Sequence, residues 1–332
     1  MRPGAFGMMN AMTTIIPVAS GKGGVGKTVF TANIGVALAR AGKTVILVDL
    51  DLGGSNLHTC LGEKNDKAGV GNYIYKQEPS LESLLVETRE PRLFFIPGDS
   101  LLPGTANLPY FRKVKIIKEL TGLIADYVIL DLGSGSNHNT VDFFLTSASG
   151  ILVITPETTS VLNAYSFVKA TLFRMIYRSF PARSREREVV RRFTTERIEG
   201  SERSTRALIS RLGEVSQEAA RTTAEQVRGF LPRVVLNMGR SNRDVPLGAK
   251  LRHVARKNLD VEVQYIGFLP YDEHVGTSII RRRPLLSLEP GSAFARGLEH
   301  VTSRLVREPT PKTPKLFEAD EDLEEVVQEA SF

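Results

Sequence analysis

The chain of 332 residues contains one cysteine, no tryptophan and no long apolar run. A single cysteine, Cys60, excludes an internal disulfide framework and a CxxC metal site within one chain. We therefore expect no iron–sulfur cluster and a reducing, cytoplasmic location. No apolar stretch approaches the roughly 18–20 residues needed to cross a bilayer. Residues 1–12 have one arginine and no apolar centre, which argues against a secretory signal.

The composition is 42% hydrophobic and 24% charged, which excludes the disordered and fibrous classes. The net charge of +6 is unevenly distributed along the chain. Residues 309–332 hold two lysines and seven acidic residues, a net charge of −5, so the preceding residues carry +11. A basic body attracts nucleic acid or anionic lipid, but charge balance alone does not choose between them.

Short runs rich in valine, isoleucine and leucine alternate with helical patterns. We expect strands over residues 14–19, 44–49, 93–97, 127–131, 150–155, 233–237 and 261–268, and helices over 28–41, 111–124, 160–177, 204–230 and 293–307. Most of the strands are continuous apolar runs, as in strands buried on both faces. The alternation predicts an α/β fold with a doubly wound, mainly parallel sheet flanked by helices.

Two segments differ from this pattern. Residues 178–204 are rich in arginine with interspersed glutamate and have no clear apolar face. After residue 307, spaced prolines precede an acidic stretch, which we interpret as a linker and a flexible tail with a short helix over 320–329. The expected organisation is an N-terminal extension (1–13), a main domain (14–307) with an Arg-rich helical insertion at about 178–230, and an acidic tail (308–332).

A glycine-rich segment follows the first expected strand and opens the first helix: Gly21-Lys22-Gly23-Gly24-Val25-Gly26-Lys27-Thr28. Glycines let backbone N–H groups approach phosphate oxygens, and the helix N-terminus adds partial positive charge. In this pattern Lys27 reaches the β- and γ-phosphates and the Thr28 hydroxyl ligates Mg²⁺. The glycines also satisfy the G-x-G-x-x-G pattern of dinucleotide-binding folds. The Lys-Thr pair and the acidic strand end at Asp131 favour a nucleoside triphosphate instead.

Acidic residues end two of the expected strands. Asp49 and Asp51 lie on the same side of the second strand end, because side chains alternate along a strand. Asp131 ends an apolar strand in the Walker B pattern, where it would hold Mg²⁺ through water. The alternatives are a solvated strand-end turn and a capping aspartate. Asn237 also ends a strand, a position where asparagine is often only a turn former.

With Lys22 in its phosphate loop, the sequence resembles the deviant Walker A ATPases of the MinD/ParA family, and most closely the FlhG/MinD branch. Residues 49–56, 155–160 and 271–284 carry the branch resemblance. It spans roughly residues 14–307 and implies a P-loop NTPase fold of the SIMIBI type, with ATP and Mg²⁺ as cofactors.

The resemblance also implies roles for single residues. Lys22 would reach across a homodimer to the partner's ATP, and Asp51 would orient or deprotonate the attacking water, so the implied catalytic residues are Lys22, Lys27 and Asp51. The implied magnesium residues are Thr28, Asp49 and Asp131. The implied nucleotide-binding residues are Gly21, Gly23, Gly24, Val25, Gly26, Lys27, Thr28 and Val29 of the loop, Gly133 at the γ-phosphate, and Asn237 and Pro270 at the base.

The chain departs from the family pattern in three places. Val29 stands where many relatives have a second threonine, so an α-phosphate contact is lost. The acidic tail would be repelled by anionic lipid, unlike the basic C-terminal helix of MinD and FlhG. The segment 180–230 is longer than expected, and Arg183, Arg185, Arg187, Arg191 and Arg192 are either a phosphate-binding patch or a salt-bridged surface.

The sequence therefore predicts a slow, partner-stimulated ATPase that dimerises with ATP and positions or regulates a cellular structure such as flagella or the division site. It would need an activating or cargo protein and act in the cytoplasm, with peripheral placement at the inner membrane or cell pole as an option. The alternatives are a partition-type ATPase that binds DNA non-specifically and a nucleotide-binding regulator with little turnover.

Overall fold

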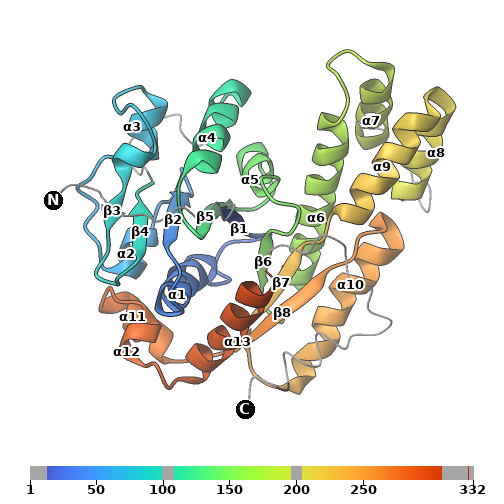
Figure 1. The fold of residues 1–332 in the computed structure, drawn as a ribbon. Coiled ribbons are helices and arrows are strands. Elements are labelled where there is room, and N and C mark those ends of the chain that lie inside the picture. The colour runs from blue at the N-terminus through green and yellow to red at the C-terminus, as the bar shows by residue number, and fades with distance from the viewer. Residues whose placement is uncertain (1–12, 99–107, 196–203, 309–327, 329–332) are drawn as a thin grey trace.

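A computed structural model describes residues 13–98, 108–195, 204–308 and 328. The expected doubly wound α/β architecture is confirmed, with an eight-stranded sheet in the order β3-β4-β2-β5-β1-β6-β7-β8 (Figure 1). All neighbouring strands are parallel except the short β3, which runs antiparallel to β4. The strands are β1 (Thr14–Ser20), β2 (Val45–Leu50), β3 (Val86–Glu87), β4 (Leu93–Ile96), β5 (Tyr127–Ser134), β6 (Ile151–Ile154), β7 (Arg233–Gly239) and β8 (Gln264–Pro270).

Helices cover both faces of this sheet, and each face has its own apolar core. One core includes residues of α3 (Val70–Ile74), α4 (Tyr110–Gly122), α5 (His138–Phe144), α6 (Thr158–Arg178), α7 (Arg185–Thr195), α8 (Thr205–Val215), α9 (Gln217–Gly229) and α10 (Val245–Leu259). The other includes residues of α1 (Lys27–Arg40), α2 (Leu57–Leu61), α12 (Leu285–Leu288) and α13 (Ala293–Arg307). α11 (His274–Ile280) and the 3₁₀ turns Glu82–Leu84 and Asn242–Asp244 complete the described elements.

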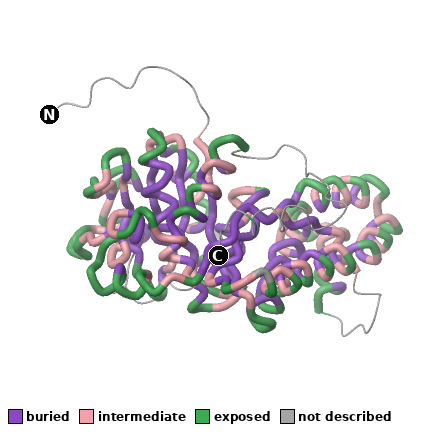
Figure 2. The backbone as a smooth tube through the Cα atoms, turned by 90° about the horizontal axis from the view of Figure 1, so that it is seen from below, coloured by how far each residue is buried: buried purple, intermediate pink, exposed green. Residues whose placement is uncertain are grey.

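Burial follows from this layering. Every residue of β2 is buried, as the continuous apolar run predicts for a central strand of a parallel sheet. Figure 2 shows buried backbone running through the middle of the molecule and exposed residues on the outer turns. Because parallel strands share one direction, all their carboxyl ends lie along one edge of the sheet, where ligands of open α/β folds bind.

The structure corrects several boundaries. The stretch 204–230 is two helices, because Ser216 ends α8 and its hydroxyl accepts a hydrogen bond from the Ala219 N–H at the start of α9. Residues 185–195 form an amphipathic helix, α7, which buries Val190 and Phe193. The prediction that the segment 178–204 has no clear apolar face was therefore wrong. The strand expected from residue 261 begins at Gln264.

α10 was not predicted at all. Its first turn contains Pro246 and Gly248, which are loop signals in a sequence. The helix forms because proline is tolerated in a first helical turn and Leu251, Ala255 and Leu259 pack into the core. No described helix is both long and apolar enough to span a bilayer. Residues 1–12 and most of the acidic tail lie outside the described residues, although Gln328 is helical.

Candidate nucleotide site

The glycine-rich loop connects β1 to α1 at the carboxyl edge of the sheet, where the pattern places it. Gly24 and Gly26 have φ values of 79° and 83°, in the left-handed region that glycine adopts without strain. Gly21 lies so close to α6 that a Cβ there would be 2.3 Å from the backbone carbonyl carbon of Asn163. The loop is therefore held by its packing against α6 as well as by its own turns.

Lys27 and the end of β5 meet at the centre of this edge. The Lys27 Nζ atom donates to Asp131 Oδ1 at 2.7 Å, and Thr31, one helical turn after Lys27, donates to the same oxygen at 3.0 Å. Both Lys27 and Asp131 are almost fully buried. Thr31 was not predicted, although its i+4 spacing from the lysine on α1 places it on the same helix face.

A second buried carboxylate lies beside Asp131. Asp49 and Asp131 are direct neighbours in the register of β2 and β5. Asp49 Oδ2 accepts from the Ser55 hydroxyl at 2.6 Å and from the Leu57 N–H at 3.1 Å, and its Oδ1 accepts from the Asp51 N–H at 3.1 Å. Burial, together with the neighbouring Asp131 charge, raises the pKa of Asp49 to about 7. Asp49 thus organises the loop that follows β2, a contact that the sequence did not indicate.

Asp51 and Gly133 face each other across the neighbouring strand ends. Asp51 is half-buried, and burial raises the pKa of its carboxyl. A Cβ on Gly133 would lie 3.2 Å from Asp51 Oδ1. The loop after β5 also approaches the phosphate loop, because a Cβ on Gly23 would lie 3.7 Å from the Ser134 hydroxyl. The structure therefore brings together the loops that hold Asp51, Gly133 and Gly23.

The residues present fit a magnesium–nucleotide site. The Asp131 Oδ2 atom is buried and has no hydrogen-bond partner among the described residues. The Thr28 hydroxyl accepts from Lys27 Nζ at 3.4 Å, and the same amino group donates to Asp131 Oδ1. No group of three or more acidic, histidine or cysteine ligands occurs among the described residues. Mg²⁺ in nucleotide sites needs only one or two protein ligands, since phosphates and water supply the rest.

Lys22 contacts residues of its own chain in the described structure. Its amino group forms an ion pair with Glu157 and donates to the Thr159 hydroxyl at 3.3 Å, both at the start of α6. The side chains of Lys22 and Glu157 are 28% and 58% exposed, so the pair is accessible to water and can exchange partners. Sequence reasoning missed Glu157 as a partner, because 135 residues separate it from Lys22.

The two residues expected at the base lie near the carboxyl ends of the last two strands of the sheet, and β7 continues past the expected end at Asn237 to Gly239. Asn237 on β7 is buried, and its side-chain amide donates to the Val25 carbonyl oxygen at 2.8 Å. Its role in the described structure is therefore to brace the phosphate loop. Pro270 is the buried last residue of β8 and lies opposite Gly239 in the register. Thr28 and Val29 are both half-buried at the start of α1.

Cys60 follows the Asp49–Asn56 loop on α2. Burial, reinforced by the nearby Asp131 and Asp49 charges, raises the pKa of its thiol to about 12. The thiolate is the reactive form of cysteine, so this side chain is unreactive at neutral pH.

Three of the five arginines named in the insertion contact neighbouring side chains. Arg191 and Arg192 both pair with Glu188, and Arg187 stacks on the Tyr177 ring with its guanidinium carbon 4.2 Å from the ring centroid. Such contacts are the salt-bridged surface that mixed charge commonly forms, and exposed pairs of this kind add about 0–1 kcal/mol each.

Comparison with known proteins agrees with this geometry. The family model of the CobQ/CobB/MinD/ParA nucleotide binding domain matches residues 16–285. The chain is 25% identical over 304 residues to the antiactivator FleN of Pseudomonas aeruginosa, covering 91% of this chain and 89% of FleN. It is 32% identical over 172 residues to the flagellum site-determining protein YlxH of Helicobacter pylori, covering 50% of this chain and 56% of YlxH.

A solved structure has the same fold. The septum site-determining protein MinD of Pyrococcus horikoshii, complexed with Mg-ADP, superposes with a TM-score of 0.60 at 22% sequence identity. The match covers 91% of this chain and 100% of that one.

Proposed function

Because the chain belongs to the CobQ/CobB/MinD/ParA nucleotide-binding family, we propose that it is an ATP-binding and ATP-hydrolysing switch. ATP would join two copies into a homodimer, and hydrolysis would separate them. The observation that carries the proposal is the Lys27–Asp131 contact at the mouth of the phosphate loop, with the second Asp131 oxygen buried and without a partner among the described residues.

Each site residue would have its own role in binding or hydrolysis. Lys27 and the loop N–H groups would bind the phosphates, as the helix N-terminus favours negative charge. Thr28 and Asp131 would hold Mg²⁺, which supplies charge neutralisation at the phosphates, and Asp49 would keep the loop carrying Asp51 in place. Asp51, half-buried beside Gly133, would orient the attacking water or accept its proton. Asn237 and Pro270 would border the base.

Lys22 would provide the link between two copies. Its ion pair with Glu157 is exposed, so leaving it costs little. In the dimer its amino group would meet the partner's triphosphate, where a fixed positive charge stabilises the charge that develops during phosphoryl transfer. Turnover would be slow in the isolated protein and faster with an activating partner.

The relatives suggest what the switch serves. FleN is an antiactivator, YlxH determines the flagellum site and MinD determines the septum site. We extend this to positioning of flagella or of the division site, in the cytoplasm and peripherally at the inner membrane or cell pole. FleN carries more weight than YlxH, since it is matched over nearly its whole length, whereas the chain spans about half of YlxH.

Light scattering of the full chain with ATP and Mg²⁺ tests the proposal. The wild type should double its mass with ATP, Lys22→Ala should stay monomeric, and Asp51→Ala should remain dimeric without releasing phosphate. Lys64→Ala, which changes an exposed lysine elsewhere, is the matched control and should behave as wild type. A wild type that keeps its monomer mass with ATP, or a Lys22→Ala protein that still dimerises, would overturn the proposal.

A further inference from the structure

A large cavity lies between α5, α6 and α7. Its volume is about 710 Å³, and its fourteen lining residues include no aspartate or glutamate. The apolar part of the wall includes Phe173, Val190 and Phe193, and the basic part includes Lys169, Arg174 and Arg191. A cavity with apolar and basic walls fits an occupant that is both apolar and acidic.

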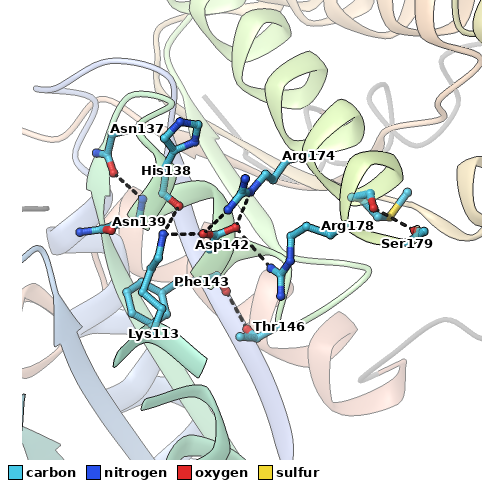
Figure 3. Close-up of polar contacts among 11 residues, drawn as sticks. Lys113, Asn137, His138, Asn139, Asp142, Phe143, Thr146, Arg174, Arg178 and Ser179 are labelled. Carbon is cyan, nitrogen blue, oxygen red and sulfur yellow. Dashed lines mark hydrogen bonds and ion pairs between the residues drawn. The ribbon is translucent and has the colours of Figure 1, made fainter. Parts of the chain in front are cut away.

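One residue of the basic wall, Arg174, is fixed in place by Asp142 (Figure 3). Asp142 is completely buried and forms ion pairs with Lys113 at 2.5 Å, Arg174 at 2.7 Å and Arg178 at 3.3 Å. The Arg174 guanidinium binds both carboxylate oxygens, so its orientation is set before any ligand arrives. One buried negative charge thus holds three positive ones, of which Arg174 lines the cavity.

The outer wall is fixed as well. The rings of Phe173 on α6 and Phe193 on α7 have centroids 5.9 Å apart, and the Arg211 guanidinium of α8 lies 5.4 Å from the Phe193 centroid. α7 is therefore held against both α6 and α8.

The C-terminal segment of the same chain has the complementary chemistry. Five of its apolar residues, at Leu316, Ala319, Leu323, Val326 and Ala330, recur at helical spacing, whereas Phe317 and Phe332 lie off this face. Seven acidic residues occupy other positions of residues 318–329. Gln328, the one described residue of this segment, is helical and exposed, and its spacing places it on the side opposite Val326 and Ala330.

The C-terminal segment leaves the domain at the same edge of the sheet at which α6 ends. The Glu308 carbonyl oxygen accepts from Arg233, the first residue of β7, so the chain leaves the domain at the amino edge of the sheet. α6 ends at the same edge, because the Ser179 hydroxyl donates to Gln226 near the end of α9, which leads into β7. The seven residues 309–315 span up to roughly 25 Å when extended.

We propose that residues 316–332 dock as an acidic amphipathic helix in the cavity between α5, α6 and α7 of their own chain. Leu323 and Val326 would face Phe173 and Phe193, and the acidic residues would face Lys169 and Arg191. The cavity also reaches Ser136 and His138, directly after the loop that carries Gly133. The docked segment would therefore lie beside the part of the nucleotide site formed by β5.

Hydrogen exchange of the full chain, without nucleotide, tests the docking. Leu323→Asp should accelerate exchange of the amides of α7 and of residues 166–177 by roughly tenfold, the factor that corresponds to the lost burial of one leucine. Gln328→Asp is the matched control, since it adds the same charge on the opposite side of the helix, and it should leave these amides unchanged. Equal exchange in Leu323→Asp and wild type would overturn the proposal.

A cross-link distinguishes this occupant from others. In a Cys60→Ser chain, Ala170→Cys on α6 and Val326→Cys in the tail should form a disulfide within one molecule under mild oxidation. Lys169→Glu should reduce its yield, and Glu325→Lys added to Lys169→Glu should restore it. No cross-link, or one that joins two chains, would show that the cavity serves a second copy or another protein and would refute docking in the same chain.

Discussion

The buried Asp49 carboxyl predicts an unusual pH dependence of stability. Its pKa of about 7 lies well above the ordinary value, because burial and the adjacent Asp131 charge oppose its ionisation. A raised folded pKa contributes stability that is fully present below the unfolded pKa of about 4 and is lost as the pH rises towards 7. In the nucleotide-free protein, this one group therefore makes the wild type less stable at pH 7 than at pH 5.

Asp49→Asn isolates the effect. The amide cannot ionise, so the free energy of unfolding of Asp49→Asn relative to wild type should rise by about 1.4 kcal/mol per pH unit, or about 2–3 kcal/mol from pH 5 to pH 7. The Asp51 N–H loses its carboxylate acceptor in the variant, which costs about 1 kcal/mol at every pH. This constant cost cancels when the difference in free energy between variant and wild type at pH 5 is subtracted from the difference at pH 7.

Urea unfolding at half-unit steps from pH 5 to pH 7.5 is the assay. Asp66→Asn, which changes an exposed carboxylate, is the control and should give a profile parallel to wild type. If the Asp49→Asn and wild-type profiles are also parallel, Asp49 is already ionised at pH 5, and its packing against Asp131 has no electrostatic cost.

Three further changes probe other contacts. Asp142→Asn should lower the free energy of unfolding at pH 7 by about 3–5 kcal/mol in urea titrations, because it leaves Lys113 and Arg174 without their carboxylate. Burial opposes ionisation of Asp142, but hydrogen bonds from these two cations outweigh it and lower the Asp142 pKa. The difference from wild type should therefore shrink only below about pH 4, where the wild-type carboxylate is protonated. Glu157→Gln should tighten ATP-dependent dimerisation by about fivefold or less, because an exposed ion pair no longer retains Lys22; weaker dimerisation by sedimentation would contradict this. Gly21→Ala should cost about 1–3 kcal/mol and weaken binding of a fluorescent ATP analogue, since α6 must move, whereas Gly122→Ala meets open space and should not.

The nucleotide-site hypothesis depended on local chemistry that a sequence displays. The spacing of Gly21, Gly26, Lys27 and Thr28 after a buried strand is sufficient to predict the loop, because each residue acts through its own backbone or side chain. The apolar runs ending in Asp49 and Asp131 predicted parallel strands, and the register places these two residues side by side.

Other features depended on contacts between distant segments. The pairing of Lys22 with Glu157, and the brace from Asn237 to Val25, join residues far apart in the chain. α7 carries few apolar residues, and its helical state depends on packing against α6 and α8. α10 is helical despite the loop signals Pro246 and Gly248 for the same reason: its burial against the core outweighs its weak local helix propensity.

The sequence by itself determined the parallel strands, several of the long helices and the phosphate loop, because hydrophobic periodicity and glycine geometry act over a few residues. Only the tertiary structure decided which charges meet. It placed Asp49 against Asp131, gathered three cations around Asp142 and opened a basic cavity beside them. Burial sets the energy of such charges, and burial arises only when distant segments pack together.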